Sequence, residues 1–286
     1  MRHCAASAGD IQERWFEAAD GTRLFCRDWL VEGGAAVQIV HGLGEHGGRY
    51  ARLAYLFNQA GYSVRVCDHR GHGLSGGPRG SLARPDDLLR DLKLTFDDFS
   101  RARGCVPLLF GHSMGGLVAA RFATGGISLV RALLLSSPAL ALDLKGWQKA
   151  LLAVSTRLAP GYALPTALPA NRLSHDPEAI WAYRDDPLNH GKIAPRLLHF
   201  MLDAMRQAQR DAARFTRPVL MQVAGEDAFV APAGSRRFFD SLPGADKTLH
   251  WYDGAYHEIF NEAPAWREPA GQDVRQWLLR LDEAGQ

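Results

Sequence analysis

The sequence has few cysteines, and their spacing suggests neither a metal site nor a disulfide framework. Its 286 residues include four, Cys4, Cys26, Cys67 and Cys105, and none belongs to a C-x-x-C pair. Metal sites and disulfide-rich domains use closely spaced Cys or His residues. Three of these cysteines lie in apolar, strand-like runs, where cysteine acts as a small buried hydrophobic side chain. We therefore expect reduced thiols and a cytoplasmic protein.

The sequence also lacks an excess of either charge and any long hydrophobic run. Lys and Arg number 33 against 31 Asp and Glu, which gives a formal net charge of +2. That balance provides no basic surface for a nucleic acid partner. No apolar stretch approaches the 18 or more residues that span a bilayer. Residues 1–15 reach a charge at Asp10 without an apolar core segment, unlike a secretory signal.

Strand-like and helix-like segments alternate along most of the chain. Residues 13–30 predict a hairpin around Asp20-Gly21. Further strands are expected at 35–44, 62–77, 106–113, 129–140, 217–230 and 247–257. Helical spacing or helix end signals mark 49–61, 85–104, 114–126, 232–242 and 271–283. Such alternation is typical of an α/β fold with a mostly parallel sheet and helices on both faces.

The alternation stops between residues 141 and 215. This stretch has no clear strand but several helical patterns, such as "GWQKALLAVSTRLA". We expect one α/β core built from residues 1–140 and 216–286. Residues 141–215 are expected to form an inserted helical cap.

A serine stands among glycines where a predicted strand meets a predicted helix. The stretch "LLFGHSMGGLVAA" holds Gly111, Ser113 and Gly115 in the pattern G-x-S-x-G. In a sharp strand-to-helix turn, larger side chains two residues either side of the serine would collide with the backbone. The N-terminus of the following helix carries partial positive charge and free N–H groups, which suit a developing oxyanion. The motif in this context predicts that Ser113 is a nucleophile.

A serine nucleophile needs a general base and an acid that orients the base. With this motif the acid and then the histidine follow the serine in the chain. Asp227, just beyond a late strand, is the first choice for the acid; Glu226 is its close rival and Asp253 a weaker one. His257 follows the last strand and is the expected base, whereas His250 lies inside that strand.

Other histidines and glycines do not fit a catalytic or cofactor role. His41, His46, His69 and His72 precede the serine. The histidines show no metal-ligand spacing, and no phosphate-binding glycine motif opens a helix, so we expect neither a metal nor another cofactor. The second half of an oxyanion hole usually comes from the loop after an early strand. The backbone N–H groups of Leu43 and Met114 are therefore the expected donors.

Six segments spread along the chain match one known family in its order. They are "HGLGEHGGRY" (41–50), "DHRGHGLSGGPRG" (68–80), "GHSMGG" (111–116), "DPEAIWAYRDDPL" (176–188), "GEDAFV" (225–230) and "HEIFNE" (257–262). With them the sequence resembles the α/β-hydrolase family, and within it the monoacylglycerol lipase and lysophospholipase branch. The resemblance implies the α/β-hydrolase fold and a triad of Ser113, Asp227 and His257.

The resemblance also implies residues for substrate recognition. In monoacylglycerol lipases, positions matching Glu45, Arg49, His112 and Tyr183 help to shape the polar pocket for the glycerol head. The inserted segment corresponds to the family's cap, whose underside holds an acyl chain and whose outer face can touch a membrane or micelle.

We therefore expect a serine ester hydrolase that cleaves a monoacylglycerol or a similar single-chain ester through an acyl-enzyme. The expected partner is a lipid or ester substrate, with transient membrane contact through the cap and no nucleic acid. A general carboxylesterase and a lysophospholipase remain alternatives. An amide hydrolase resembling a prolyl aminopeptidase is a further alternative, since the fold does not decide which bond is cleaved. A non-catalytic binding protein is the alternative from another class.

Overall fold

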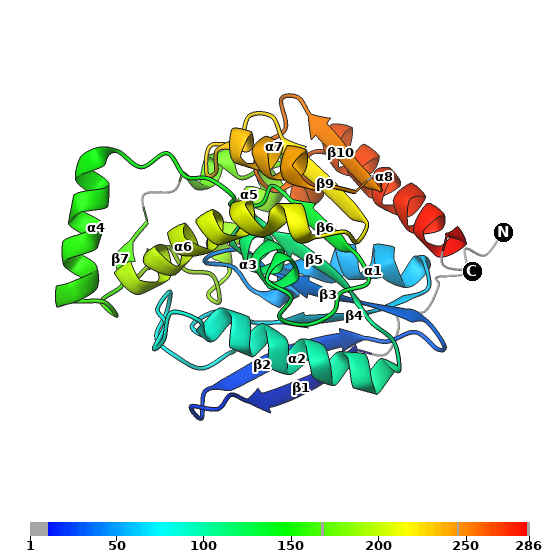
Figure 1. Ribbon diagram of the computed structural model, residues 1–286, viewed down its shortest axis with the longest axis horizontal. Helices are drawn as coiled ribbons and strands as arrows, with labels where there is room; N and C mark the ends of the chain where they lie inside the picture. The colour runs from blue at the N-terminus through cyan, green and yellow to red at the C-terminus, as the bar shows by residue number, and fades with distance from the viewer. Residues whose placement is uncertain (1–10, 167–168, 245, 285–286) are drawn as a thin grey trace.

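A mostly parallel sheet of eight strands forms the centre of the protein in a computed structural model that describes residues 11–166, 169–244 and 246–284 (Figure 1). The strands lie in the order β1-β2-β4-β3-β5-β6-β9-β10. The pairs β1–β2 and β2–β4 are antiparallel, and the others are parallel. Their bounds are β1 Ile11–Glu17, β2 Arg23–Trp29, β3 Ala35–Val40, β4 Tyr62–Cys67, β5 Leu108–His112, β6 Leu133–Ser136, β9 Val219–Ala224 and β10 Lys247–Tyr252.

Helices cover both faces of this sheet, because successive strand residues point to opposite sides. Leu109 and Leu133 pack into one buried cluster, and their neighbours Leu108 and Leu134 pack into another. The first cluster includes side chains of α2 Asp87–Arg103, α3 Ser113–Thr124, α6 Pro195–Asp211 and α7 Pro232–Ser241. The second includes side chains of α1 Ala51–Gln59 and α8 Pro264–Glu283. The α/β fold class expected from the sequence is confirmed.

The terminal helix α8 begins earlier than its sequence pattern predicts. The expected start at residue 271 is wrong, because the helix begins at Pro264. Proline suits the first helical position, since its φ is already helical and its missing N–H needs no partner there. Pro269 lies inside the helix. An interior proline usually interrupts a helix, which is why the sequence pattern favoured the later start.

The segment between β6 and β9 adds no strand to the central sheet among its described residues. It contains α4 Gly146–Leu158, the short strands β7 Leu164–Pro165 and β8 Lys192–Ile193, α5 Pro177–Asp185 and α6. In Figure 1, α4 stands at the left, away from the sheet, whereas α6 lies against α3. Backbone bonds tie the segment to core loops: His190 N–H donates to Gly44 O and Ala194 N–H to Gly80 O, both at 2.8 Å.

Two of the cysteines form a disulfide, so the expectation of reduced thiols is wrong for this pair. Cys26 on β2 and Cys67 on β4 stand opposite each other in the antiparallel pairing, with Cα atoms 3.9 Å apart, and their sulfurs are bonded. The sequence pattern could not reveal this pair, because it does not show that β2 and β4 are neighbours. Cys105 is free and half-buried, and Cys4 lies outside the described residues. The cytoplasmic location was expected because reduced thiols were expected, and the disulfide removes that argument.

The disulfide is expected to stabilise the junction between β2 and β4. Replacing both Cys26 and Cys67 by Ala should lower the free energy of unfolding by about 2–4 kcal/mol, measured by urea denaturation. Cys105→Ala is the matched control and should change that free energy much less. Alkylation of the denatured protein should modify Cys26 and Cys67 only after reduction. Modification of both before reduction would show that the bond is absent in solution.

Candidate active site

Ser113 stands at the junction of β5 and α3 with a backbone φ of +53°. This left-handed conformation is rare for a residue with a side chain and costs about 1–3 kcal/mol, so the surrounding chain must hold it in place. A Cβ added at Gly111 would lie 2.5 Å from the carbonyl oxygen of Gly115, and one added at Gly115 would collide with the carbonyl of Val40. The glycine spacing of the motif therefore follows from the close packing of this turn.

Three side chains from separate segments form a chain of hydrogen bonds. Ser113 Oγ lies 2.8 Å from His257 Nε2, and His257 Nδ1 lies 2.6 Å from Asp227 Oδ2. The other carboxylate oxygen of Asp227 accepts the N–H groups of Phe229 and Val230 at 2.8 and 3.1 Å. These bonds fix the orientation of the carboxylate. The structure thus brings together the serine, acid and histidine expected from the sequence.

The charges around His257 favour its protonated form. Burial alone would lower the pKa of His257, but the charge and hydrogen bond of Asp227, with the charges of Glu258 and Glu45, raise it. Burial would raise the pKa of Asp227, yet His257 and the two backbone N–H groups lower it. Asp227 is therefore ionised and can stabilise an imidazolium formed when His257 takes a proton from Ser113.

Two backbone N–H groups near Ser113 are available to an oxyanion. Met114 is the second residue of α3, and its amide has no acceptor within the helix. Leu43 lies in the loop after β3, and its N–H meets no acceptor in the described chain. The neighbouring Gly42 N–H donates to Glu45 Oε1 at 2.6 Å, which anchors this loop. Leu43 and Met114 remain the candidate oxyanion donors.

A cavity of about 590 Å³ opens beside Ser113. Apolar side chains from the core and from the 141–215 segment form much of its wall: Leu43, Leu142, Leu144, Leu173, Ile193, Leu198, Met201, Phe229 and Val230. Polar groups of the wall include Glu45, His112, Tyr183, Asp227, His257 and Glu258. A mostly apolar hollow with a few polar groups beside a nucleophile suits a substrate with a long apolar part.

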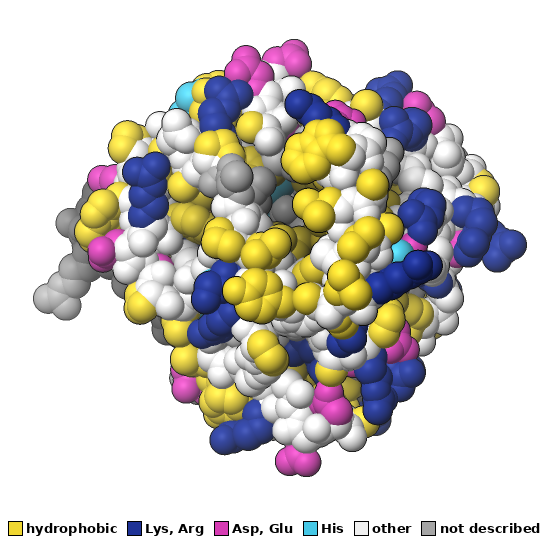
Figure 2. Space-filling view, turned by 90° about the vertical axis from the view of Figure 1, so that its left-hand side faces the viewer, with side chains coloured by type: hydrophobic (Ala, Val, Ile, Leu, Met, Phe, Trp, Pro, Cys, Tyr) yellow, Lys and Arg dark blue, Asp and Glu magenta, His cyan; other side chains and the backbone are white. Residues whose placement is uncertain are grey.

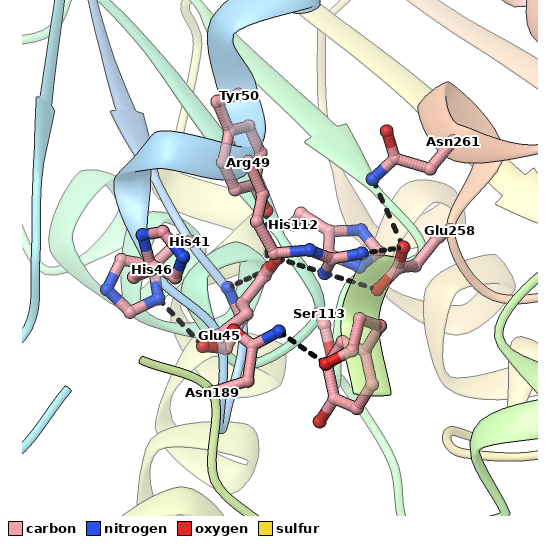
Figure 3. A network of polar contacts seen from close by, with 12 residues as sticks. His41, Glu45, His46, Arg49, Tyr50, His112, Ser113, Asn189, Glu258 and Asn261 are labelled. Atoms are coloured by element: carbon pink, nitrogen blue, oxygen red, sulfur yellow. Dashed lines mark hydrogen bonds and ion pairs between the residues drawn. The ribbon is translucent and has the colours of Figure 1, made fainter. Parts of the chain in front are cut away.

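The four residues expected to contact a glycerol head lie close together but not all at the cavity wall. Glu45, His112 and Tyr183 line the cavity, whereas Arg49 lines two neighbouring hollows. Arg49 donates to Glu45 Oε2 at 2.7 Å (Figure 3). Its guanidinium carbon lies 4.9 Å from the centre of the Tyr183 ring. Arg49 therefore lies outside the cavity and contacts two residues of its wall, Glu45 and Tyr183.

Three further wall residues, His112, Tyr183 and Glu45, have shifted pKa values. Burial lowers the pKa of His112 to about 4, so its ring is neutral; its Nδ1 lies 3.1 Å from Ser136 O. Burial, and then the charge of Glu45, raises the pKa of Tyr183 to about 12. Burial would raise the pKa of Glu45, but Arg49 and other neighbours lower it, so Glu45 is ionised.

Glu258 is a residue of this site that the sequence analysis left without a role. It follows His257 directly, and its two oxygens accept Arg49 Nη1 and Nη2, each at 2.7 Å. Its side chain is buried together with those of Arg49 and Glu45. The only available signal was its place in "HEIFNE", since nothing in the sequence pairs a glutamate with an arginine 209 positions away.

The residues set aside in the sequence analysis lie in other surroundings. His250 Nδ1 lies 3.3 Å from Asp273 Oδ2, and the backbone carbonyl of Asp253 accepts Trp266 Nε1 at 2.9 Å. Glu226 is exposed on the loop that holds Asp227. Four other histidine rings, tilted or edge-on to one another, join core loops to the 141–215 segment: His41, His69, His72 and His190. Burial lowers the pKa of each of these four.

No helix in the described part of the chain combines the length and apolarity needed to cross a membrane. In the same residues, no group of three or more His, Cys, Asp or Glu side chains is arranged to hold a metal ion.

Comparisons with known proteins agree with this geometry. A monoacylglycerol lipase of Mycolicibacterium smegmatis is 32% identical over 274 residues, which covers 93% of this chain and 96% of the relative. A monoglyceride lipase of Rattus norvegicus is 32% identical over 282 residues, covering 93% and 90%. The crystal structure of Paleococcus ferrophilus monoacylglycerol lipase is 35% identical, with a TM-score of 0.80, and covers 95% of this chain and 99% of that one.

The family profile that matches the chain is Hydrolase_4, described as serine aminopeptidase, S33, and it covers residues 32–264. This range includes Ser113, Asp227 and His257. With its doubly covered parallel sheet and its serine at a glycine-lined turn, the chain belongs to the serine aminopeptidase S33 (Hydrolase_4) family of α/β-hydrolases.

Proposed function

We propose that the protein is a serine ester hydrolase that cleaves monoacylglycerols, or similar single-chain esters, into a fatty acid and an alcohol. The observation that carries this proposal is the hydrogen-bonded chain of Ser113, His257 and Asp227 at the wall of a largely apolar cavity. The names of the relatives in bacteria, archaea and mammals point to the same substrate class.

The reaction proceeds through an acyl-enzyme. His257 Nε2 takes the hydroxyl proton of Ser113 as Oγ attacks the ester carbonyl, and the Leu43 and Met114 amides stabilise the oxyanion. His257 then protonates the departing alcohol, which leaves the fatty acyl group on Ser113. Water, deprotonated by the same histidine, attacks the acyl carbonyl; the bond to Ser113 Oγ then breaks, Oγ takes the proton back from His257, and the fatty acid is released. Asp227 stays ionised and holds the tautomer of His257 throughout.

The cavity wall has an apolar part that suits the acyl chain and a polar part that suits the head group. Its apolar wall takes the acyl chain, which leaves water and so contributes binding free energy with each methylene. The polar wall residues Glu45, His112 and Tyr183 border the position of the alcohol. Arg49 acts from behind Glu45, because two carboxylates already occupy its donors.

An aminopeptidase reaction is less well supported by the charges at the site. A free amino terminus is a cation, and a carboxylate without another partner beside the nucleophile would suit it. Glu45 and Glu258 are bonded to Arg49, and Asp227 is bonded to His257. Asp143 lines the cavity but is exposed. A lysophospholipase and a general carboxylesterase would use the same chemistry, and the substrate series below separates them.

Residues 141–215 serve in this proposal as a cap that delivers the lipid to the cavity. The helix α4 exposes an apolar stripe at helical spacing, in which Trp147, Leu151, Val154 and Leu158 are each more than half exposed. Figure 2 shows hydrophobic side chains, with Lys and Arg among them, gathered on the face of the molecule that carries α4. Such a face suits transient contact with a membrane or micelle.

The substrate proposal is tested with a series of 1-monoacylglycerols from short to long acyl chains. A lysophospholipid, a short aryl ester and a proline aryl amide serve as comparisons. We expect selective turnover of monoacylglycerols, and Ser113→Ala should lower kcat by about 10⁵-fold or more. Turnover of the short ester alone would indicate a general carboxylesterase. Cleavage of the amide alone would overturn the ester proposal and leave the nucleophile standing.

The raised pKa of His257 predicts the acid side of the pH profile. The base works only when neutral, so kcat/KM should fall as the pH decreases through its pKa. Because that pKa is raised, the midpoint should lie above the ordinary histidine value of about 6.5. The measurement is kcat/KM against pH for a soluble aryl ester. A midpoint below 6.5 would contradict this electrostatic description.

The apolar stripe on α4 is tested by making it polar. Replacing Leu151 and Leu158 together by Ser should lower binding to phosphatidylcholine vesicles at least about tenfold, since each leucine loses its transfer from water. Turnover of a soluble short ester should stay within about twofold. Leu129→Ser, at an exposed leucine just before β6 and outside α4, is the control. Vesicle binding unchanged in the α4 variant would refute the contact.

A further inference from the structure

Buried hydrogen bonds connect the loop beside Ser113 to the residue that follows His257. Gly42 N–H and Tyr50 OH donate to Glu45 Oε1, each at 2.6 Å. Arg49 donates to Glu45 Oε2 and to both oxygens of Glu258, all at 2.7 Å (Figure 3). These bonds connect the backbone N–H of Gly42, just before Leu43, to the side chain of Glu258, just after His257.

This connection passes through three charged groups that are almost fully removed from water. The side chains of Glu45, Arg49 and Glu258 are 5%, 10% and 6% exposed. A buried set of paired charges contributes little more to folding stability than apolar side chains of similar size, because each charge loses its hydration. Its contribution is instead directional, since a guanidinium holds two carboxylates in fixed planes.

The same charged group receives two contacts from the 141–215 segment. The Tyr183 ring lies over the Arg49 guanidinium, and Leu173 O accepts the backbone N–H of Glu258 at 2.9 Å. Asn261 Nδ2 adds a bond of 3.1 Å to Glu258 Oε2. Glu258 is therefore held from several sides, and its carboxylate has little freedom to leave Arg49.

We propose that Glu258 is a positioning residue: through Arg49 and Glu45 it fixes the oxyanion-hole backbone at Gly42–Leu43 relative to His257. The inference rests on the proposed serine hydrolase function. The N–H of Leu43 must point at the substrate oxygen while His257 faces Ser113. A displacement of about 1 Å between such groups can cost about 10²-fold in rate. Glu258 lines the cavity, but Arg49 and Asn261 already bind its carboxylate oxygens, so it acts through its neighbours.

The charge of Glu258 gives the proposal a second signature. The carboxylates whose charges act on His257 are Asp227, Glu45 and Glu258; Arg49 is the cation bonded to the last two, and the neutral ring of His112 lies tilted to that of His257 with centres 4.8 Å apart. Asp143 lines the same cavity at an exposed position. Removing the negative charge of Glu258 takes away one group that favours the imidazolium. The acid limb of the pH profile should therefore move to lower pH.

The experiment compares Glu258→Gln with the wild-type enzyme on a soluble aryl ester. We expect kcat to fall about 10- to 100-fold with KM changed less than about threefold, since the oxyanion is bound only in the transition state. Inactivation by an alkyl p-nitrophenyl phosphonate, in which Ser113 Oγ displaces p-nitrophenolate and the polarised phosphoryl oxygen occupies the oxyanion hole, should slow by a similar factor. The midpoint of the acid limb should shift downwards. Glu258→Asp, which keeps the negative charge, should restore the pH midpoint of the acid limb but only part of the lost kcat.

Glu226→Gln is the matched control, because it removes an exposed carboxylate beside Asp227 without touching Arg49. It should leave kcat and the pH profile unchanged. Arg49→Met and the double variant Arg49→Met with Glu258→Gln complete a cycle. If the two residues act as one unit, the double variant should be no slower than the slower single variant.

Two results would overturn the proposal. One is a Glu258→Gln enzyme that unfolds at lower urea concentration, but whose folded molecules keep the wild-type kcat, the wild-type rate of reaction with the phosphonate and the wild-type midpoint of the acid limb. The other is multiplicative losses in the cycle, which would mean independent roles. Failure of the wild-type protein to react with the phosphonate would instead refute the serine hydrolase function itself, so the two failures are distinguishable.

Discussion

The active site depends on one backbone constraint, the left-handed conformation of Ser113 between a buried strand and a helix. The turn brings the serine hydroxyl to the edge of the sheet and directs the first amides of α3 toward the same point. Only glycine at positions 111 and 115 permits this close packing. The strain is balanced by the packing of α3 and β5, which are among the most buried elements of the protein. A rigid core therefore sustains a local conformation that would not persist in a loop.

Around this turn the protein separates apolar from charged surroundings. Leucine, isoleucine and phenylalanine side chains line the part of the cavity suited to an acyl chain. Asp227, Glu45 and Glu258 provide three carboxylates near a single histidine, and Arg49 offsets two of them. The three carboxylates favour a positive imidazolium, and in the proposed mechanism backbone amides rather than side-chain cations bind the negative oxygen.

Sequence patterns predicted the elements that depend on local physics. Alternating periodicity gave the strands and helices, and G-x-S-x-G with the order of later acids and histidines pointed to Ser113, Asp227 and His257. Pairings between distant segments lay beyond such patterns. Cys26 meets Cys67 because β2 joins the sheet antiparallel to β4, and Glu258 meets Arg49 because two loops converge at one sheet edge. The early start of α8 was missed because the tolerance of Pro269 depends on tertiary packing.

The 141–215 segment connects two neighbouring parallel strands: it follows the carboxyl end of β6 and leads to the amino end of β9. Leu133 and Val219, the first residues of these strands, stand opposite each other, and beyond the carboxyl ends of the strands Ala231 N–H donates to Ala141 O at 3.1 Å. A connection between adjacent strands can change in length without altering the pairing of the strands. The part that carries α4 and α5 can therefore be longer, shorter or differently shaped in relatives, whereas α6 packs against α3 in the core and keeps its place. We expect related enzymes that act on other substrates to differ mainly in this part of the chain, while the catalytic centre stays the same.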